Sequence, residues 1–275
     1  MPTIPPESVP SPDPRPHQHR ETAESFGSDA VRYDRARPRY PRALVDRIVA
    51  APGPDVLDVG CGTGIAARQF QAAGCNVLGV EPDVRMAELA RQLGTPVDVA
   101  TFEDWDPAGR TFDTVVAGQA WHWVDPAAGT AKAARVLRPG GRLAVFWNAF
   151  HFPPEVADGI VAVCRRAVPD APFDFRAMTQ ESPDGYRALL AEPTAELRRV
   201  DAFGEPEQWR FDWEWTYTRE AWLDQMPTQG AFTRLPADRL AEVLQGTGAV
   251  IDAAGGSFAM RYATVAVTAT RTGTP

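Results

Sequence analysis

Short apolar runs recur along the first half of the chain and alternate with segments of helical periodicity. The apolar runs predict five buried strands, over residues 55–59, 76–81, 97–100, 112–117 and 143–147. The segments between them predict helices over about 64–73, 83–93 and 125–138. Gly74 and Gly94 stand where glycine commonly ends a helix. Strands that alternate with helices imply right-handed crossovers and a parallel sheet, with ligands at the carboxyl ends of the strands.

The second half of the chain contains one strand of period two. Aromatic residues occupy one face of this strand and polar residues the other; the aromatic ones are Trp209, Phe211, Trp213, Trp215 and Tyr217. The aromatic face either packs the core of the sheet or forms a wall of a substrate pocket. Residues 168–185 predict a loop or lid, residues 219–254 predict helices, and residues 258–267 predict a closing strand.

Length and composition narrow the possible classes of protein. The 275 residues can bury a full core, as one large domain or two small ones. Residues 1–20 are rich in proline and predict a disordered tail. No apolar run approaches the length of a membrane span and no signal segment is evident, so we expect a cytoplasmic protein with no membrane partner. The net charge of −8 argues against binding of nucleic acid, which needs clustered basic residues.

The cysteines predict no metal site. Cys61, Cys75 and Cys164 show no metal-ligand spacing and are interpreted as small buried thiols in a reducing compartment. A redox role for Cys61 is the alternative, because this residue precedes a helix N-terminus, where the pKa of a thiol falls.

Residues 55–64, Asp-Val-Leu-Asp-Val-Gly-Cys-Gly-Thr-Gly, predict a strand, a tight glycine-rich turn and the start of a helix. Such a turn lets the backbone approach a ligand closely. The third glycine, Gly64, comes one residue earlier than in the G-x-G-x-x-G pattern that binds a pyrophosphate. Asp58 lies two residues before the first glycine, where its charge would repel a pyrophosphate but attract an ammonium group.

A second acidic residue, Glu81, ends the next predicted strand. A doubly wound sheet places a carboxylate there to accept hydrogen bonds from ribose hydroxyls. One carboxylate for an ammonium group and one for a ribose describe S-adenosylmethionine better than a dinucleotide. A glycine turn that serves packing alone is the alternative.

Two stretches, VLDVGCGTG at 56–64 and VLGVEPDVRMAELAR at 77–91, resemble motifs I and II of the class I S-adenosylmethionine-dependent methyltransferases. The resemblance implies a Rossmann-like, doubly wound α/β fold, with a mostly parallel seven-stranded sheet, an antiparallel last strand and a small helical cap. It also implies one methyltransferase domain over residues 21–275. Within it, residues 21–150 form a cofactor-binding core, residues 151–257 mostly a cap and substrate region, and residues 258–270 a closing strand.

The resemblance further implies a set of cofactor-binding residues. Residues 31–41 are similar to the Y-D-x-x-R-P-x-Y-P lead-in of a subfamily common in actinobacteria, in which an aromatic residue and an arginine lie over the methionine end of the cofactor. Tyr33 and Arg37 match that pair, and a solvated basic face is the alternative. Glu103 is either a contact or a surface charge. The full predicted set is Tyr33, Arg37, Asp58, Gly60, Cys61, Gly62, Glu81, Pro82, Met86, Thr101, Phe102 and Gln119.

His122 is the predicted catalytic residue. It lies just past the fourth predicted strand, and its imidazole could take a proton from a hydroxyl or an acidic carbon during methyl transfer. In the family, the W-H-W-x-D stretch faces the transferred methyl group, which supports this role; a histidine wedged between aromatic residues for structure is the alternative. The predicted substrate residues are Tyr40, Trp121, Trp123 and Trp147.

The predicted reaction is transfer of a methyl group from S-adenosylmethionine to an oxygen or carbon of a small-molecule acceptor, with a secondary metabolite as one candidate. The chain lacks the [ND]-P-P-[YF] segment of enzymes that methylate amino groups of bases, which again disfavours nucleic acid as a partner. A non-methylating rearrangement or cyclisation and a non-catalytic cofactor-binding protein stay open. A nicotinamide oxidoreductase is disfavoured by Asp58. A monomer or a homodimer is expected.

Overall fold

The computed structural model describes residues 25–50, 53–171, 175–178 and 183–273. The predicted tail over residues 1–20, and part of the loop predicted over 168–185, lie outside the described residues.

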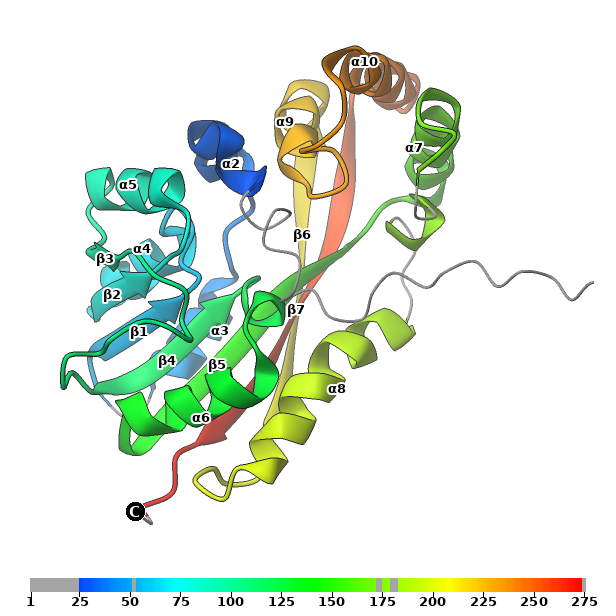
Figure 1. The fold of residues 1–275 in the computed structure, drawn as a ribbon. Helices are drawn as coiled ribbons and strands as arrows, with labels where there is room; N and C mark the ends of the chain where they lie inside the picture. The colour runs from blue at the N-terminus through cyan, green and yellow to red at the C-terminus, as the bar shows by residue number, and fades with distance from the viewer. Residues whose placement is uncertain (1–24, 51–52, 172–174, 179–182, 274–275) are drawn as a thin grey trace, which may run out of the picture.

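Seven strands form one sheet, which Figure 1 shows together with its flanking helices. The strands are β1 (Asp55–Val59), β2 (Asn76–Val80), β3 (Val97–Asp98), β4 (Phe112–Gly118), β5 (Leu137–His151), β6 (Glu207–Thr218) and β7 (Ser257–Thr270). Their order across the sheet is β3-β2-β1-β4-β5-β7-β6. β7 runs antiparallel to both of its neighbours, and the other pairs are parallel. The predicted Rossmann-like fold with an antiparallel last strand is therefore confirmed.

Helices connect the strands and cover both faces of the sheet. In chain order they are η2 (Phe26–Asp29), α2 (Ala30–Ala36), α3 (Arg42–Val49), α4 (Ile65–Ala72), α5 (Val84–Gln92), η3 (Trp121–Trp123), α6 (Pro126–Val136), α7 (Pro154–Ala167), η4 (Phe175–Met178), α8 (Pro183–Arg199), α9 (Arg219–Gln225), η5 (Met226–Thr228) and α10 (Ala237–Ala253). The Asp83 side chain caps α5 by accepting a hydrogen bond from the Arg85 amide. Gly74 and Gly94 follow α4 and α5 at φ values of +93° and +94°, as glycines that end helices do.

Two layers of helices bury the sheet. On one face, α3 and α4 pack Leu44, Ile48 and Phe70 into an apolar cluster with the strands. On the other face, α6 and α8 lie against β5, and α8 also contacts β7. Trp105, from the chain before β4, completes the cluster on that side. Each fully buried apolar side chain of this kind contributes about 1.5–3 kcal/mol, so these two clusters hold the strand ends in fixed positions.

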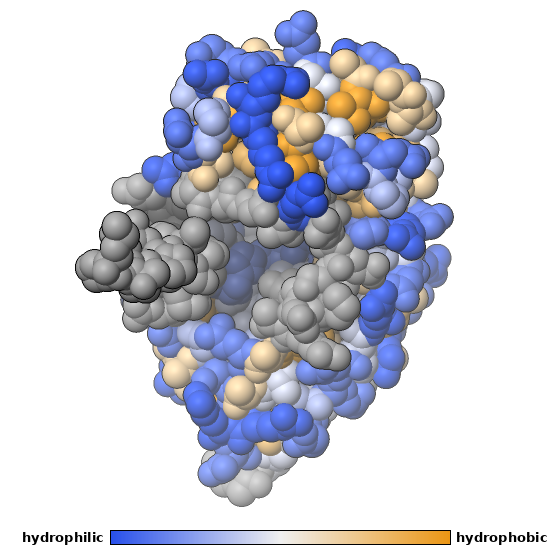
Figure 2. Space-filling view, turned by 90° about the vertical axis from the view of Figure 1, so that its right-hand side faces the viewer, coloured by the Kyte–Doolittle hydropathy of each residue, from blue (hydrophilic) through white to orange (hydrophobic). Residues whose placement is uncertain are grey.

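A helical cap extends from one end of the sheet. β5, β6 and β7 are longer than the other strands and continue past them to α7, α9 and α10 (Figure 1). A separate apolar cluster, which includes Trp222, Met226, Ile251 and Met260, fills the space between these helices and the strands. On the face drawn in Figure 2, apolar side chains gather at the upper end, where the cap lies. The cap implied by the resemblance is thus present.

Some boundaries differ from those predicted. β5 covers residues 137–151 instead of 143–147. The Arg-Pro-Gly-Gly stretch at 138–141 was expected to end a helix, but it continues as extended chain because it bonds to the neighbouring β7 end. The segment predicted as helical over 219–254 is divided into α9, η5 and α10. Pro236 is the N-cap of α10 and marks the point where the helix resumes.

Candidate active site

A cavity of about 330 Å³ lies at the carboxyl ends of β1, β2 and β4, against α2. Every predicted site residue except Trp121 and Trp147 lines it. Those that do so are Tyr33, Arg37, Tyr40, Asp58, Gly60, Cys61, Gly62, Glu81, Pro82, Met86, Thr101, Phe102, Gln119, His122 and Trp123. The structure therefore brings segments that are far apart in sequence to one place, at the edge where a doubly wound sheet binds ligands. The roles of these residues toward a ligand stay predictions.

The glycine-rich turn forms one wall of the cavity. Gly60, Gly62 and Gly64 have φ values of +63°, +55° and +82°, which favour glycine. A Cβ atom on Gly60 would stand 2.6 Å from the Cβ of Ala120, so the turn lies tightly against the chain that follows β4. The Gly60 amide donates to the Val80 carbonyl at 2.8 Å. The turn is thereby held against the ends of both β2 and β4.

Asp58, in β1, lines the cavity with a buried carboxylate that forms no ion pair within the described residues. The residue is 1% exposed, and within the described part of the chain neither of its side-chain oxygens accepts a hydrogen bond of ordinary geometry. Burial raises the pKa of Asp58 to about 7; the Ala67 amide opposes this effect and the charge of Glu81 adds to it. A buried carboxylate without a partner is unfavourable, and a cationic ligand group would supply the partner.

Glu81 follows β2 directly and holds two stretches of backbone. Its Oε2 accepts a hydrogen bond from the Gly62 amide and its Oε1 from the Asp83 amide, each at 2.9 Å. Burial raises the pKa of Glu81 to about 7, against the effect of these two hydrogen bonds. Each carboxylate oxygen has a second lone pair, so Glu81 can hold the turn and still accept a hydrogen bond from a ligand hydroxyl.

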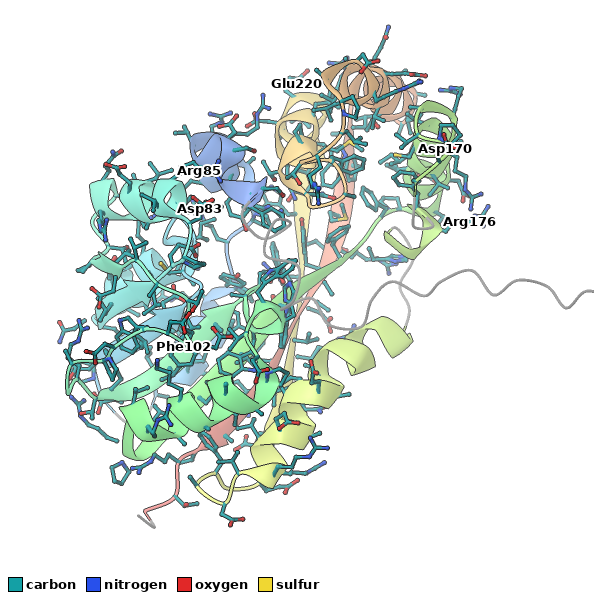
Figure 3. The ribbon with its side chains drawn as sticks, viewed as in Figure 1. Asp83, Arg85, Phe102, Asp170, Arg176 and Glu220 are labelled. Carbon is teal, nitrogen blue, oxygen red and sulfur yellow. The ribbon has the colours of Figure 1, made fainter. Side chains whose placement is uncertain are left out.

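Phe102 lies in the loop after β3, on the cavity wall (Figure 3). Its ring stacks toward Trp105 at a centroid distance of 6.4 Å and lies 6.2 Å from the ring of Trp121. Trp121, which the sequence predicts to contact substrate, does not line the cavity. It is 3% exposed because η3 packs its indole into the same core cluster as Phe102.

Two polar residues of the same loop are already hydrogen-bonded. Thr101 Oγ1 donates to Asp104 Oδ2 at 2.8 Å, and Glu103 Oε1 accepts from the Asp125 amide at 2.7 Å. Glu103 therefore holds the start of α6 while it lines the cavity. The predicted cofactor contacts of Thr101 and Phe102 stay predictions.

η2 and α2 close one side of the cavity. The Arg37 guanidinium lies 4.7 Å from the centroid of the Tyr33 ring, and its Nη2 donates to the Thr228 carbonyl at 2.5 Å. Phe26 also lines the cavity and meets the rings of Tyr33 and Trp123 edge on, at 6.1 and 6.3 Å. These contacts make an aromatic wall and place one cation beside it.

The start of α5 leaves room for η2. Asp83 and Arg85 lie between α5 and α2 in Figure 3, and their side chains form an ion pair at 2.6 Å. A Cβ on Gly27 would stand 2.0 Å from Asp83 Oδ2, so η2 passes directly over this pair. Only glycine fits there without a shift of the carboxylate.

Asp34 anchors α2, and sequence reasoning missed it. Its Oδ1 accepts hydrogen bonds from Thr63 Oγ1 at 2.8 Å and from Arg68 Nη2 at 2.5 Å. On its other side, α2 is tied to the cap by an ion pair of Arg35 with Asp224, at 2.7 Å. All of these partners lie in other elements, so the sequence contains Asp34 as the acidic residue of the Y-D-x-x-R-P-x-Y-P stretch but does not reveal its contacts.

His122 contacts a tryptophan on each side. Its Nδ1 accepts a hydrogen bond from Trp147 Nε1 at 3.1 Å, and the Trp123 ring centroid lies 4.8 Å from its own. Burial lowers the pKa of His122 to about 4. Trp147, predicted to contact substrate, is 3% exposed and touches His122 without lining the cavity. The role of His122 as a base stays a prediction.

Gln119 adopts a backbone conformation that is unusual for its residue type. Its φ is +58°, its amide donates to the Phe146 carbonyl at 2.8 Å, and its Nε2 donates to the Asn148 carbonyl at 3.3 Å. A residue other than glycine held in this region costs about 1–3 kcal/mol, and such strain concentrates at functional sites. The strained residue lies on the cavity wall, as a functional position would.

Neither a metal site nor a membrane span is found among the described residues. Across 25–50, 53–171, 175–178 and 183–273, no group of three or more His, Cys, Asp and Glu side chains could hold a metal ion. Among the helices described, none has the length and apolar character needed to cross a membrane. Burial raises the pKa of the Cys61 thiol well above its usual range, which opposes a redox role for it.

Comparisons with known proteins point to one class. Residues 57–145 match the sequence model of a family described as a methyltransferase domain. An uncharacterized methyltransferase of Mycobacterium tuberculosis is 41% identical over 132 residues, which are 47% of this chain and 54% of that protein. The demethylmenaquinone methyltransferase of Corynebacterium urealyticum is 28% identical over 172 residues, 62% of this chain and 69% of the relative. The chain thus spans about half the length of the mycobacterial relatives it matches.

A solved structure extends the likeness over most of the chain. It comes from Anaeromyxobacter dehalogenans, is provisionally described as a type II methyltransferase, and has a TM-score of 0.60 at 28% identity over 84% of this chain and 97% of its own. The family match, the mycobacterial relatives and this fold confirm the predicted resemblance. Residues 57–145 thus carry the sequence of a methyltransferase domain.

Proposed function

We propose that the protein binds S-adenosylmethionine in this cavity and transfers its methyl group to an oxygen or carbon of a small molecule. The observation that carries the proposal is the Asp58 carboxylate, which lines the cavity beside the glycine-rich turn with both oxygens buried and, among the described residues, no cationic partner. The amino acid end of S-adenosylmethionine brings an ammonium group that would pair with it. The pyrophosphate of a dinucleotide would instead be repelled.

The cavity residues suit separate parts of the cofactor. Asp58 would hold the ammonium group, and the turn at Gly60 and Gly62 would let the backbone approach the same end. Glu81 would accept hydrogen bonds from the ribose hydroxyls, since each of its oxygens keeps a free lone pair. Phe102 would pack against the adenine. The volume of about 330 Å³ lies within the range of small-molecule sites.

The chain itself contributes orientation and exclusion of water. The cofactor would supply a methyl group bound to a positively charged sulfur. That sulfur is a good leaving group. What is left for the protein is to align the acceptor with that methyl group and to keep water away. The aromatic wall of Phe26, Tyr33 and Trp123 serves both purposes at one side of the cavity.

The acceptor is proposed only as a class. The name of the Corynebacterium relative gives demethylmenaquinone, a small molecule, as its substrate. The acidic composition of the chain, with a net charge of −8, agrees with a small molecule better than with a nucleic acid. A secondary metabolite stays one candidate within this class.

Calorimetric titration with three ligands tests the proposal. S-adenosylmethionine and S-adenosylhomocysteine both carry the ammonium group, whereas 5′-methylthioadenosine has the ribose and adenine without the amino acid end. Asp58→Asn should weaken binding of the first two about tenfold or more and leave the third unchanged, because only the first two can use a charge-assisted hydrogen bond at this residue. Glu81→Gln should weaken all three.

The pattern across ligands separates the proposal from its rivals. A folded wild-type protein that binds none of the three ligands would overturn it. A loss of 5′-methylthioadenosine binding in Asp58→Asn would show that this residue does not act on the amino acid end. Release of S-adenosylhomocysteine together with a methylated product, from a panel of phenols and carboxylic acids, would identify the transfer itself.

A further inference from the structure

One contact of His122 determines which of its ring nitrogens carries the proton. Trp147 Nε1 lies 3.1 Å from His122 Nδ1. An indole N–H can only donate a hydrogen bond, so Nδ1 has to be unprotonated in order to accept it. In the neutral imidazole the proton is then on Nε2.

The other ring nitrogen is the one left to the cavity. An imidazole directs its two nitrogens to different sides, and Nδ1 is turned to Trp147, which does not line the cavity. His122 does line it, and within the described residues no hydrogen-bond partner is found for Nε2. The group that the ring offers to a ligand is therefore an N–H donor.

We propose that Trp147 is a positioning residue that keeps His122 neutral with its proton on Nε2, so that His122 donates a hydrogen bond to the methyl acceptor and does not act as a base. To take a proton from the acceptor, Nε2 would first need its own proton moved to Nδ1. The Nδ1–H would then face the indole N–H of Trp147, and two donors would meet. A doubly protonated ring faces the same conflict.

The surroundings of Trp147 make this arrangement hard to change. Trp147 is 3% exposed and belongs to the core cluster of the sheet. It lies in β5, where it pairs with Val265 of β7, so its backbone is held by the sheet. Burial also lowers the pKa of His122, to about 4, which agrees with a ring that stays neutral near pH 7.

The acceptor that suits such a donor brings an anionic oxygen, as a carboxylate, a phenolate or an enolate does. This part rests on the proposed function, since it takes the acceptor to lie beside His122. The methyl group is then transferred without a proton passing to His122. An acceptor that reaches the cavity already ionised satisfies this condition, because no proton has to be removed.

The protonation of His122 can be observed without cofactor or acceptor. Long-range proton–nitrogen NMR spectra distinguish protonated from unprotonated ring nitrogens, and the full chain has four histidines, at 17, 19, 122 and 151. Comparison with the His122→Gln variant assigns the signals of His122. We expect an unprotonated Nδ1 and a protonated Nε2 throughout the range from about pH 5.5 to about pH 8.

Two tryptophan variants test whether Trp147 is responsible. Trp147→Phe keeps an aromatic ring but removes the N–H, and should give signals of both tautomers and a higher pKa for His122. Trp123→Phe is the matched control: Trp123 also touches the ring, at 4.8 Å, but no hydrogen bond joins the two, so the tautomer should not change. If Trp147→Phe does not fold, the wild-type spectrum alone shows whether the proton of His122 is on Nε2, as the inference requires.

A protonated Nδ1 in the wild type, or a wild-type His122 that titrates near pH 6.5, would overturn the inference. If the folded Trp147→Phe variant gave the wild-type spectrum, Trp147 would not be the residue that sets the tautomer of His122. Calorimetry with S-adenosylmethionine on the same wild-type sample keeps the two proposals apart. If the protein binds S-adenosylmethionine but His122 carries its proton on Nδ1, only this inference is overturned. If His122 carries its proton on Nε2 but S-adenosylmethionine does not bind, only the proposed function is overturned.

Discussion

Asp58 and Glu81 make the unliganded cavity sensitive to pH. Burial raises the pKa of each to about 7, whereas in the unfolded chain such carboxyls lose their protons near pH 4. Between these values the folded protein holds more protons than the unfolded chain does. The free energy of unfolding in that window therefore falls as pH rises. A bound cation acts in the opposite direction, because it favours the ionised carboxylate.

We expect Asp58→Asn to lose part of this pH dependence. Asparagine has the shape of a protonated aspartate and does not ionise, so the stability of the variant relative to the wild type should grow from about pH 4 to about pH 7 and stay constant above that. The slope between them should change by up to about 1.4 kcal/mol per pH unit. Urea unfolding at several pH values, without cofactor, measures it. Asp46→Asn, in an exposed ion pair with Arg42, is the control. An unchanged slope in Asp58→Asn would refute the raised pKa.

Gly60 and Gly62 allow conformational strain to be separated from a steric clash. Both have positive φ, but a Cβ on Gly62 would meet nothing within 4 Å, whereas a Cβ on Gly60 would lie 2.6 Å from that of Ala120. We expect Gly62→Ala to lower the free energy of unfolding by about 1 kcal/mol and Gly60→Ala by about 2 kcal/mol or more. Adding Ala120→Gly should recover the difference between them. Urea unfolding of the four proteins checks this, and equal losses would mean that no clash exists.

The chemistry around the glycine-rich turn could be predicted because it is local in sequence. Asp58 lies two residues before Gly60, and Glu81 ends the next apolar run, so strand positions alone place both at one edge of the sheet. The contacts of Asp34 and Trp147 could not be predicted in this way. Their partners belong to other elements, and only the packed fold brings each pair together.

The tryptophans show a related limit. A run such as Trp121-His122-Trp123 indicates that a loop lies at the cavity edge, but it does not tell which ring turns inward. The 3-10 geometry of η3 sends Trp121 to the core and leaves Trp123 at the cavity. That direction depends on the backbone dihedral angles, which a list of residues does not contain.

Among the elements, α2 bridges the sheet and the cap. Asp34 bonds Arg68 beside the glycine-rich turn, and Arg35 bonds Asp224 of α9. Because α2 also carries Tyr33 into the cavity wall, we expect these contacts to limit local opening of the wall. Bound cofactor, lying beneath α2, should hold it in place further.

We expect Asp34→Ala to speed the cutting of α2 by trypsin after Arg32 and Arg35. Hydrogen bonds to charged groups contribute about 1.5–3 kcal/mol, so their loss should raise the opening of α2 about tenfold or more. S-adenosylhomocysteine should slow the cut in the wild type. Mass spectrometry of early fragments measures the rate. Asp46→Ala removes only the exposed pair with Arg42 and should cut like the wild type. Equal rates in all three proteins would show that Asp34 does not anchor α2.

The order of the elements could be predicted from apolar periodicity, but the length of β5 could not. Residues 138–141, Arg-Pro-Gly-Gly, have the composition of a helix end. They become strand because Gly140 and Gly141 exchange hydrogen bonds with Arg271, beyond the end of β7, more than a hundred residues later. Pairing between distant strands overrides local preference here, as it does in many sheets.

For the molecule as a whole, the cavity and the cap are built from different parts of the chain. Among the described residues, those that line the cavity all lie between Phe26 and Val124. The cap cluster begins at Phe152. β7 joins the two halves, since Met260 packs in the cap cluster and Val265 in the cluster of the sheet. Cap packing should therefore be separable from cofactor binding.

The contact between α7 and α10 offers a way to loosen the cap alone. The two helices approach closely because a glycine of each helix faces a valine of the other. A Cβ on Gly246 would lie 2.6 Å from Val163 Cγ1. A Cβ on Gly159 would lie 2.6 Å from Val250 Cγ1. Neither valine can move far, because each belongs to the packed interface of the pair. A larger side chain at either glycine has to push the helices apart.

We expect Gly246→Leu to speed hydrogen exchange across α7 and α10 while β1, β2 and β4 keep their protection. Affinity for S-adenosylhomocysteine should stay within about threefold, a change below 1 kcal/mol, because the lining residues remain in place. Gly248→Ala is the matched control, since its Cβ would meet only the movable guanidinium of Arg219. Exchange is followed by mass spectrometry and affinity by calorimetry. If cap protection and cofactor binding were lost together, the two halves would form one cooperative unit, and α2 would transmit the change from α9 to the cavity wall.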